Sequence, residues 1–316
     1  MKSLVSYTAA LRRGRTGLVL LVAMVLCACV TATPTPVPST TTAWPTAVPP
    51  TRTIAPPTVT AIQPIATSEP PTPEPAATSL YISGPDVAFQ GVRLNVSTAL
   101  ASGVGAQEAS TADWGKPYPA NSAYTEFRLA DYHNQNKYFE PLILICSLNE
   151  LGEYSAESVT ELRRLLTERP PAPERSAPVL PFLHAGKLLE AQIRYLEFQN
   201  GSGVRVVTQF AQNTWPVNNE GLVYVFQGMT SDGAYYVSAF LPAAVPFLPD
   251  KVDDPEAVPP VDGIPFPNWS SPDFDTEWSN YREAVTQKLN TTPAQEFTPD
   301  LRLLDALIQS VLVGLP

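Results

Sequence analysis

The stretch LLEAQIRYLEFQNGSGVRVVTQFAQNTWPVNNEGLVYVFQGMTSDGAYYVSAFLP, residues 188–242, carries the clearest structural pattern in the chain. Its four alternating runs are rich in β-branched and aromatic residues, as strands are. The first and third connections, Asn200–Gly203 and Ser231–Gly233, contain Asn-Gly and Asp-Gly, which tolerate the positive φ values of tight hairpins. Because such short connections force neighbouring strands to be antiparallel, the stretch predicts a four-stranded meander.

Weaker patterns N-terminal to the meander predict further strands. Residues 81–96 alternate polar and apolar side chains around turn signals, which indicates a first strand or hairpin. Residues 101–123 are rich in Ala, Ser and Gly and predict an exposed loop. Glu126–Leu129 is expected to be a short strand, and the apolar run Pro141–Ser147 a buried one.

Two helices are predicted on either side of the meander. The sequence Ser158-Val159-Thr160-Glu161 matches a capping box and predicts a helix over residues 158–168, with its apolar face on the sheet. After a proline-rich segment at 249–275, aromatic and aliphatic residues at helical spacing predict a second helix over about Asp275–Leu289.

A third helix is predicted near the end of the chain. Thr298-Pro299-Asp300 would supply a capping hydroxyl, a proline in the first turn and an acid. An apolar stripe runs from Leu301 to Leu312, with Asp305 on the polar side. Together these elements predict an α+β module over residues 80–316, in which a few helices pack on an antiparallel sheet.

The first 28 residues predict a lipoprotein signal peptide. A basic segment from Lys2 to Arg15 precedes an apolar run at Gly17–Leu26, and Leu26-Cys27-Ala28-Cys29 resembles the lipobox of bacterial lipoproteins. Even extended to Val30, the apolar run would span about 21 Å as a helix, less than the hydrocarbon core. We therefore expect lipidation of Cys29, the alternatives being an ordinary secretory signal and a retained membrane anchor.

Residues 29–79 predict a disordered stalk. Proline and threonine make up about half of this segment, and it shows no period of helix or strand. Such a chain cannot bury enough apolar surface to offset its ordering entropy, and its prolines favour polyproline II. We expect it to hold the module away from a membrane bearing the lipid on Cys29.

Charge and motif content exclude several classes of function. Four of the 20 basic residues and none of the 30 acidic ones precede Cys29, which leaves 16 basic against 30 acidic residues and a net charge of −14. Such a chain is repelled by phosphate backbones, so no nucleic-acid partner is expected. Gly-x-Ser-x-Gly, His-Glu-x-x-His and Cys-x-x-Cys are absent, so no nucleophile elbow, metal or cofactor is predicted.

The segment at 195–242 resembles a recurring block in uncharacterised bacterial surface lipoproteins. The shared features are the lipobox, the Pro/Thr-rich stalk and a hairpin of the form FQNGxGVR followed by TQ. The resemblance covers about residues 80–315. It implies a location outside the cytoplasm and an architecture, and no activity.

The best candidate for ligand binding is the loop at 213–220. Trp215, with Asn218 and Asn219, could stack on a sugar or grip a peptide, and Trp114 lies in another loop-like region that could join it. The alternative is that Trp215 folds back onto the core while the asparagines make turn hydrogen bonds. His133, in the polar loop 131–138, is a further candidate, the alternative being an exposed histidine without a role.

These observations lead to a binding protein as the first hypothesis. A lipid-anchored, non-enzymatic module would recognise a glycan, a peptide or an envelope protein. A hydrolase of cell-envelope polymers is the alternative, although the chain has only two histidines, His133 and His184, as catalytic bases. A binder should show an aromatic-lined concavity without paired ionisable groups, whereas an enzyme should place two carboxylates or a histidine in a cleft. A purely structural head would lack any concavity.

Overall fold

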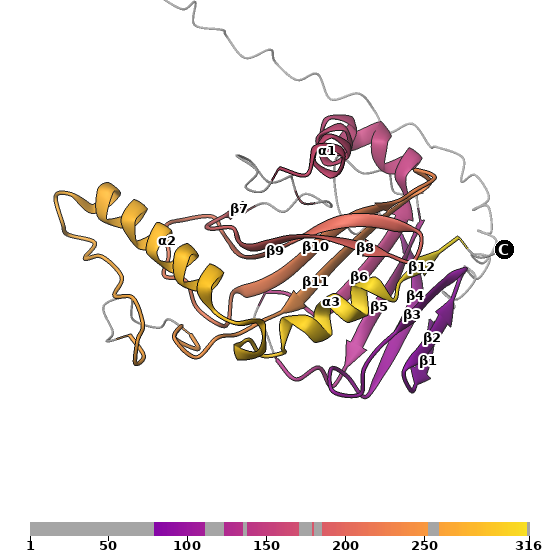
Figure 1. Cartoon of the computed structure of the whole chain (residues 1–316), viewed down its shortest axis with the longest axis horizontal. Coiled ribbons are helices and arrows are strands. Elements are labelled where there is room, and N and C mark those ends of the chain that lie inside the picture. The colour runs from indigo at the N-terminus through magenta and orange to yellow at the C-terminus, as the bar shows by residue number, and fades with distance from the viewer. Residues whose placement is uncertain are drawn as a thin grey trace, which may run out of the picture. The chain divides into compact units, whose positions relative to one another are not determined.

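The predicted meander is present and forms part of a nine-stranded antiparallel sheet (Figure 1). The order across this sheet is β1-β4-β5-β6-β11-β10-β9, and β7 and β8 both pair with the side of β9 away from β10. A second sheet has the order β12-β3-β2. The strands are β1 (Ser79–Ser83), β2 (Asp86–Phe89), β3 (Val92–Asn95), β4 (Gly103–Ser110), β5 (Ala123–Ala130), β6 (Leu142–Ser147), β7 (Gly186–Lys187), β8 (Ala191–Phe198), β9 (Gly201–Ala211), β10 (Leu222–Thr230), β11 (Tyr235–Pro242) and β12 (Leu312–Val313).

The computed structural model describes residues 79–110, 123–134, 138–170, 179, 185–251 and 259–314, all within the unit Pro70–Pro316. The predicted signal peptide, Cys29 and the stalk up to residue 78 lie outside these ranges, as do Trp114 and His184. Their placement and the predicted boundaries of the leader and stalk therefore remain predictions. Within the described ranges, no helix is long and apolar enough to cross a membrane.

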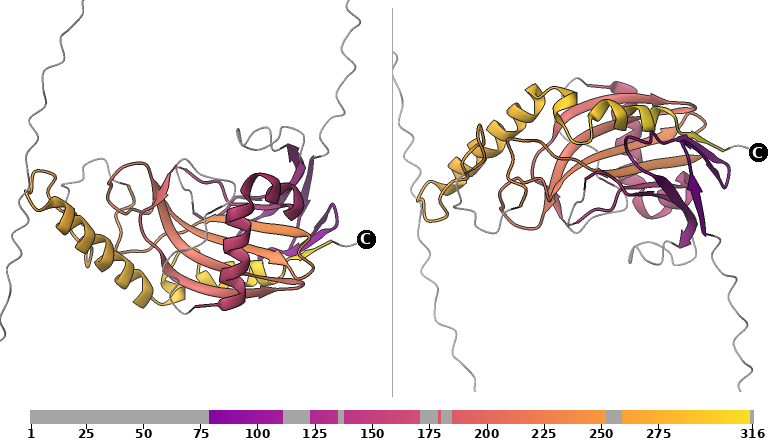
Figure 2. Two further views of the ribbon diagram at one scale, coloured as in Figure 1. Left: turned by 90° about the horizontal axis from the view of Figure 1, so that it is seen from above. Right: turned by 90° about the horizontal axis from the view of Figure 1, so that it is seen from below.

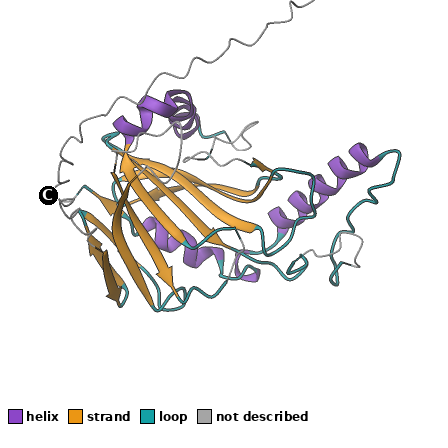
Figure 3. Ribbon diagram, turned by 180° about the vertical axis from the view of Figure 1, so that it is seen from behind, coloured by secondary structure: helices purple, strands orange, loops and turns teal. Residues whose placement is uncertain are grey.

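Helices cover both faces of the main sheet, and the fold is α+β as predicted. The helices are α1 (Leu148–Glu168), α2 (Phe274–Thr291), the short 3-10 helix η2 (Ala294–Glu296) and α3 (Leu301–Gln309). Helix α1 lies against β6, β9 and β11, and α2 and α3 lie against β8 from the other side (Figures 1 and 2). The helices on either side of the strands are also visible from behind in Figure 3.

The alternation of β10 explains why one sheet can support two cores. Val223 and Val225 pack with the residues of α1, whereas Tyr224 and Phe226 on the opposite face pack with α2 and α3. All four side chains are fully buried. Because successive strand residues face opposite ways, a strand buried on both faces must be apolar at nearly every position. That is the composition of LVYVF at 222–226.

Part of the segment at 101–123, which composition predicts to be a loop, is a strand; residues 111–122 lie outside the described residues. Residues 103–110 form β4, which pairs antiparallel with β1 on one side and β5 on the other. The sequence did not indicate this strand, because Gly, Ala and Ser have low strand propensity. The hydrogen bonds of two neighbouring strands and the burial of Val104 and Ala106 outweigh that propensity.

Helix α1 begins ten residues earlier than the capping box at Ser158 predicts. Its N-cap is Ser147, whose hydroxyl accepts a hydrogen bond from the Glu150 backbone N–H at 3.4 Å. The backbone leaves helical geometry at Ser155 (φ −140°), so the helix is kinked there. The pattern beginning at Ser158 identified only the part beyond the kink, and Ser158 itself is buried.

The start of α3 and the position of Asp305 also differ from the prediction. Asp300, and not Thr298, is the N-cap, and its carboxylate accepts a hydrogen bond from the Arg302 backbone N–H at 2.9 Å. The helix ends at Gln309, so Leu312 lies in β12, paired with Arg93 of β3. Asp305, expected on the polar side, is only 6% exposed.

Asp305 is buried because it meets polar side chains that project from the sheet. The hydroxyl of Tyr224 donates a hydrogen bond to Asp305 Oδ1 at 3.0 Å, and Arg205, which is 4% exposed, places Nη1 at 3.5 Å from the same oxygen. Arg194 approaches Oδ2 at 3.5 Å. Burial raises the pKa of Asp305, while the charge of Arg205 and the Tyr224 hydrogen bond act in the opposite direction. We call Arg205, Tyr224 and Asp305 the buried triad.

Buried tyrosines and one thiol make the fold sensitive to alkaline pH. Burial raises the pKa of Tyr281 to about 12 and that of Cys146 to about 12, the latter with help from the charge of Glu150. Burial also raises the pKa of Tyr132 and Tyr224. In the unfolded chain the pKa of tyrosine is about 10 and that of cysteine is about 8.5. Their contribution to stability is therefore complete below about pH 8.5 and is lost as the pH rises towards 12.

We expect the free energy of unfolding to fall between about pH 9 and pH 11, because the unfolded chain loses these protons first. Urea titrations followed by circular dichroism measure it. Cys146→Ala removes one of the ionising groups. The free energy of unfolding of this variant should therefore fall less steeply with pH, by up to about 1.4 kcal/mol per pH unit, the value for one proton. A stability that is flat across this interval would contradict the assignment.

Candidate binding site at the end of strand β9

Side-chain hydrogen bonds hold the loop between β9 and β10 in place. Gln209, buried at the end of β9, accepts from the Asn218 backbone N–H at 2.9 Å and donates through Nε2 to the Pro216 carbonyl oxygen at 3.2 Å. Asn218 donates through Nδ2 to the same carbonyl at 3.1 Å and accepts from the Gly221 N–H at 2.9 Å. Because buried polar groups are costly when unpaired, these bonds strongly favour one loop conformation.

Two more contacts connect the loop to distant segments. The Asn219 side chain accepts from the Val245 N–H at 2.9 Å and donates to the carbonyl oxygens of Val245 and Leu248, both at 3.1 Å. The Val217 N–H donates to the hydroxyl of Tyr281 in α2 at 3.0 Å. The loop is therefore anchored to the segment after β11 and to α2.

This anchored loop presents Trp215 at the surface. The side chain is 38% exposed, whereas Pro216 and Val217, which follow it, are buried. Its ring lies beside that of Trp269, with centroids 6.4 Å apart and planes inclined by 44°. Trp269 is 40% exposed and stacks on Phe274 at 5.0 Å. Two tryptophans from segments more than 50 residues apart thus form one aromatic surface, which we call the tryptophan pair.

An open pocket of about 390 Å³ adjoins Trp215 at the end of β9. Its lining combines aromatic and amide side chains with the strand backbone, and among its described residues there is no carboxylate, histidine, lysine or arginine. Aromatic surface with a few polar groups is the usual composition of a ligand pocket. The described lining residues are Tyr138, Ala185, Gln209, Phe210, Ala211, Gln212, Asn213, Trp215 and Asn218.

The structure exposes some of the predicted binding residues and buries others. Trp215 is exposed, so it does not fold back onto the core. Asn218 and Asn219 are buried and their amides hold the loop, as the alternative interpretation of the asparagines predicted. His133 is exposed but does not line the pocket. Trp114 lies outside the described residues, so its predicted participation is untested.

Sequence reasoning missed Trp269, the second member of the tryptophan pair. The segment at 249–275 reads as a crossing segment because it is rich in proline and acids. A usable signal was its aromatic content, since five aromatic residues occur within 266–281: Phe266, Trp269, Phe274, Trp278 and Tyr281. All five make ring contacts with one another, centred on Phe266.

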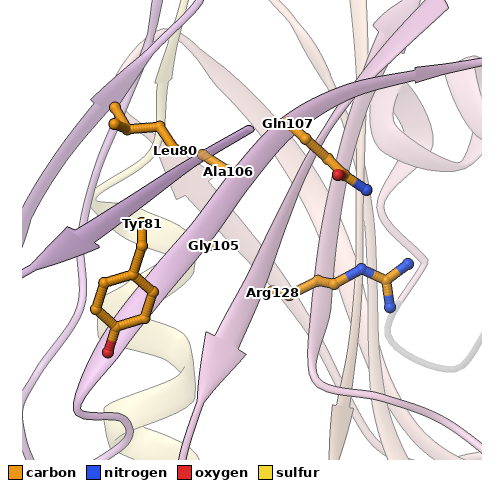
Figure 4. A pocket seen from close by; sticks show the side chains of 6 residues that line it. All are labelled: Leu80, Tyr81, Gly105, Ala106, Gln107 and Arg128. Carbon is orange, nitrogen blue, oxygen red and sulfur yellow. The ribbon is translucent and has the colours of Figure 1, made fainter. Parts of the chain in front are cut away.

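A smaller pocket of about 190 Å³ lies at the β1 edge of the sheet (Figure 4). Tyr81, Gly105 and Arg128 are in register across β1, β4 and β5, and each lines it. The guanidinium of Arg128 already pairs with two carboxylates, Glu126 at 2.9 Å and Glu140. Because Arg128 is already paired with two carboxylates, it is not available as an unpaired cation for an anionic ligand in this pocket.

A third pocket, of about 260 Å³, contains two carboxylate residues. Glu108 of β4 and Glu150 of α1 both line it, together with Cys146. Burial raises the pKa of the Cys146 thiol to about 12, so the thiol stays protonated at neutral pH and is a poor nucleophile. Neither here nor elsewhere in the described part of the chain could a cluster of three or more His, Cys, Asp or Glu residues hold a metal ion.

Comparisons with known proteins add no identification. No family model, no curated protein and no solved structure matches the chain. The protein is therefore characterised by its own features: an α+β module with helices on both faces of a nine-stranded sheet and an aromatic pocket at one end of strand β9.

Proposed function

We propose that this protein is an extracytoplasmic lipoprotein whose α+β module binds a ligand without catalysing a reaction. The basic and apolar leader and the Leu-x-Ala-Cys sequence support membrane attachment through Cys29. The Pro/Thr-rich stalk would then separate the module from the lipid surface. Two or three acyl chains at Cys29 would hold the protein stably, whereas one would not.

The exposed Trp215 on an anchored loop beside an open pocket carries the proposal for binding. An exposed tryptophan has few rotatable bonds, so it can bury a large area on a ligand at low entropic cost. Hydrogen bonds that fix the loop in advance reduce the cost of binding further. The described lining of the pocket has no carboxylate, histidine or lysine to act as a general acid or base, which favours binding over catalysis there.

Replacing Trp215 by alanine should weaken ligand binding about 30-fold or more, the loss typical of a buried aromatic anchor. The probes are peptidoglycan fragments, soluble oligosaccharides, peptides and envelope proteins, and the affinity is measured by calorimetry. Because the side chain is well exposed, the thermal midpoint should change little.

Tyr81→Ala is the matched control, since this exposed aromatic lies at the β1 edge of the sheet and outside the pocket. Equal binding of wild type and Trp215→Ala to every probe that binds would refute the role of the pocket.

Hydrolysis of envelope polymers is the second candidate, and the pocket with Glu108 and Glu150 favours it. A pair of carboxylates can act as acid and base in glycoside hydrolysis. If the protein cleaves a polymer, Glu108→Gln and Glu150→Gln should each abolish the reaction, while Trp215→Ala alone should not remove the chemistry. Lack of cleavage of purified peptidoglycan and envelope polysaccharides by the wild type would eliminate this candidate for those polymers.

A further inference from the structure

We propose that the ligand of this site is an uncharged glycan, bound across the tryptophan pair with its hydroxyls directed at the amides of the pocket. The inference rests on the proposed function, because it names the class of ligand for the same site. It is carried by four features: the geometry of the pair, the chemistry of the lining, the negative charge nearby, and the strand pairing at this end of β9.

The tryptophan pair provides an extended apolar surface that is supported by the aromatic rings packed against Trp269. Trp269 stacks on Phe274 with planes inclined by 23° and contacts Phe266 at 5.0 Å, and Phe266 packs in turn on Tyr281 at 5.2 Å. Trp215 is fixed by the hydrogen-bonded loop. A sugar ring presents apolar C–H groups on its faces and hydroxyls around its edge. The exposed indoles can cover such a face while the hydroxyls remain solvated or reach a polar partner.

The polar side chains around the pair suit hydroxyl groups. Gln212 and Asn213 precede Trp215 by three and two residues, line the same pocket and are exposed. A primary amide carries both donors and an acceptor, as does a hydroxyl, so the two can bond in either sense. A charged ligand would instead need a counter-charge, and the described lining contains none.

The charges nearby disfavour an anionic polymer in particular. Acidic residues of α2, namely Asp275 and Glu277, follow closely on Trp269, and Ser271 donates a hydrogen bond to Glu277 at 2.9 Å. The chain after Cys29 carries a net charge of −14. A polymer bearing carboxylates or phosphates would be repelled by this field.

An extended peptide is disfavoured because the strand edge at the pocket is occupied. Phe210 and Ala211 of β9 pair with Lys187 and Gly186 of β7, and Gln209 pairs with Leu222 of β10 on the other side. Peptides that add to a sheet take their affinity from unpaired main-chain groups of an edge strand. At this end of β9 the pairing with β7 covers one side of the strand as far as Ala211, and the pairing with β10 covers the other side as far as Gln209.

The test uses the full chain with three classes of probe. These are uncharged polysaccharides (β-1,4-glucan, chitin oligomers and dextran), anionic ones (polyuronate and teichoic acid), and unstructured peptides. Calorimetry and tryptophan fluorescence report binding. We expect at least one uncharged glycan to bind, with an affinity that added salt leaves unchanged. Trp215→Ala should weaken it about 30-fold or more and Trp269→Leu about tenfold or more. Trp269→Phe should weaken it less, because it keeps a ring over Phe274. Tyr81→Ala should bind as the wild type does.

The outcomes separate this inference from the proposed function. If only peptides or anionic polymers bind, and Trp215→Ala abolishes that binding, the glycan assignment is overturned while the binding function stands. Should a glycan bind with equal affinity to Trp215→Ala and Trp269→Leu, both variants having wild-type thermal midpoints, the tryptophan pair is not its site and the inference fails. If no probe of any class binds, both the inference and the proposed binding function are contradicted.

Discussion

Asp305→Ala is expected to lower the free energy of unfolding by about 3–5 kcal/mol, because it removes one partner of a buried charge pair. Arg205 would keep its charge in a site that is almost inaccessible to water, and the Tyr224 hydroxyl would lose its acceptor. Urea denaturation followed by circular dichroism measures the loss. The two-state analysis requires that the urea dependence of the free energy stay unchanged between variants.

Asp300→Ala is the matched control on the same helix. Asp300 caps α3 and pairs with Arg302 near the surface, so its loss should cost about 0.5–2 kcal/mol. A cost for Asp305→Ala no larger than that of Asp300→Ala would show that the buried triad contributes little.

The double variant Arg205→Met, Asp305→Leu tests whether charge or packing matters in the triad. Two buried atoms of Arg205, Nε and Nη1, have no hydrogen-bond acceptor among the described residues. The attraction within an ion pair that lacks some of its hydrogen bonds offsets little of the free energy lost when its charges leave water. Apolar replacements of similar volume should therefore recover most of the stability lost in Asp305→Ala. Failure of the double variant to exceed Asp305→Ala in stability would show that the ion pair and the Tyr224 hydrogen bond contribute stability that apolar packing does not replace.

Cys29→Ala should move the protein from the membrane fraction to the soluble or secreted fraction when the chain is expressed in a bacterium that processes lipoproteins. Burial of an acyl chain contributes about 0.8 kcal/mol for each methylene, so two chains account for nearly all of the expected membrane affinity. Mass spectrometry of the wild-type N-terminus should find a lipid-modified cysteine.

Cys27→Ala is the control, because the predicted cleavage before Cys29 removes residue 27 with the leader. It should leave the lipid and the membrane location intact. An unmodified N-terminus in the wild type, or a leader that stays attached, would contradict the proposed anchoring.

Local patterns in the sequence predicted the centre of the fold well. The four strands of the meander, the buried strand at 142–147 and helix α2 follow from alternation, turn residues and helical spacing. These signals depend on neighbours within a few residues, so the sequence displays them directly. The exposure of Trp215 did not follow from the sequence, which left open that the ring folds back onto the core.

Composition and local pattern predicted the structure poorly where contacts between residues distant in the sequence determine it. Strand β4 was hidden by its Gly and Ala residues, and pairing with β1 and β5 makes it a strand. Asp305 follows the polar side of a helical stripe, yet it is buried because Arg205 and Tyr224 meet it from the sheet. In each case the deciding partner lies far away in the sequence.

The sequence by itself determined the α+β class, the meander that organises the sheet, and the leader and stalk patterns on which the proposed location depends. Only the tertiary structure decided which loop residues are available to a ligand. It turned Asn218 and Asn219 inward and brought Trp269 beside Trp215 across more than 50 residues. The physical reason is that secondary structure follows from local periodicity, whereas a binding surface is assembled from side chains whose proximity depends on the packing of the whole core.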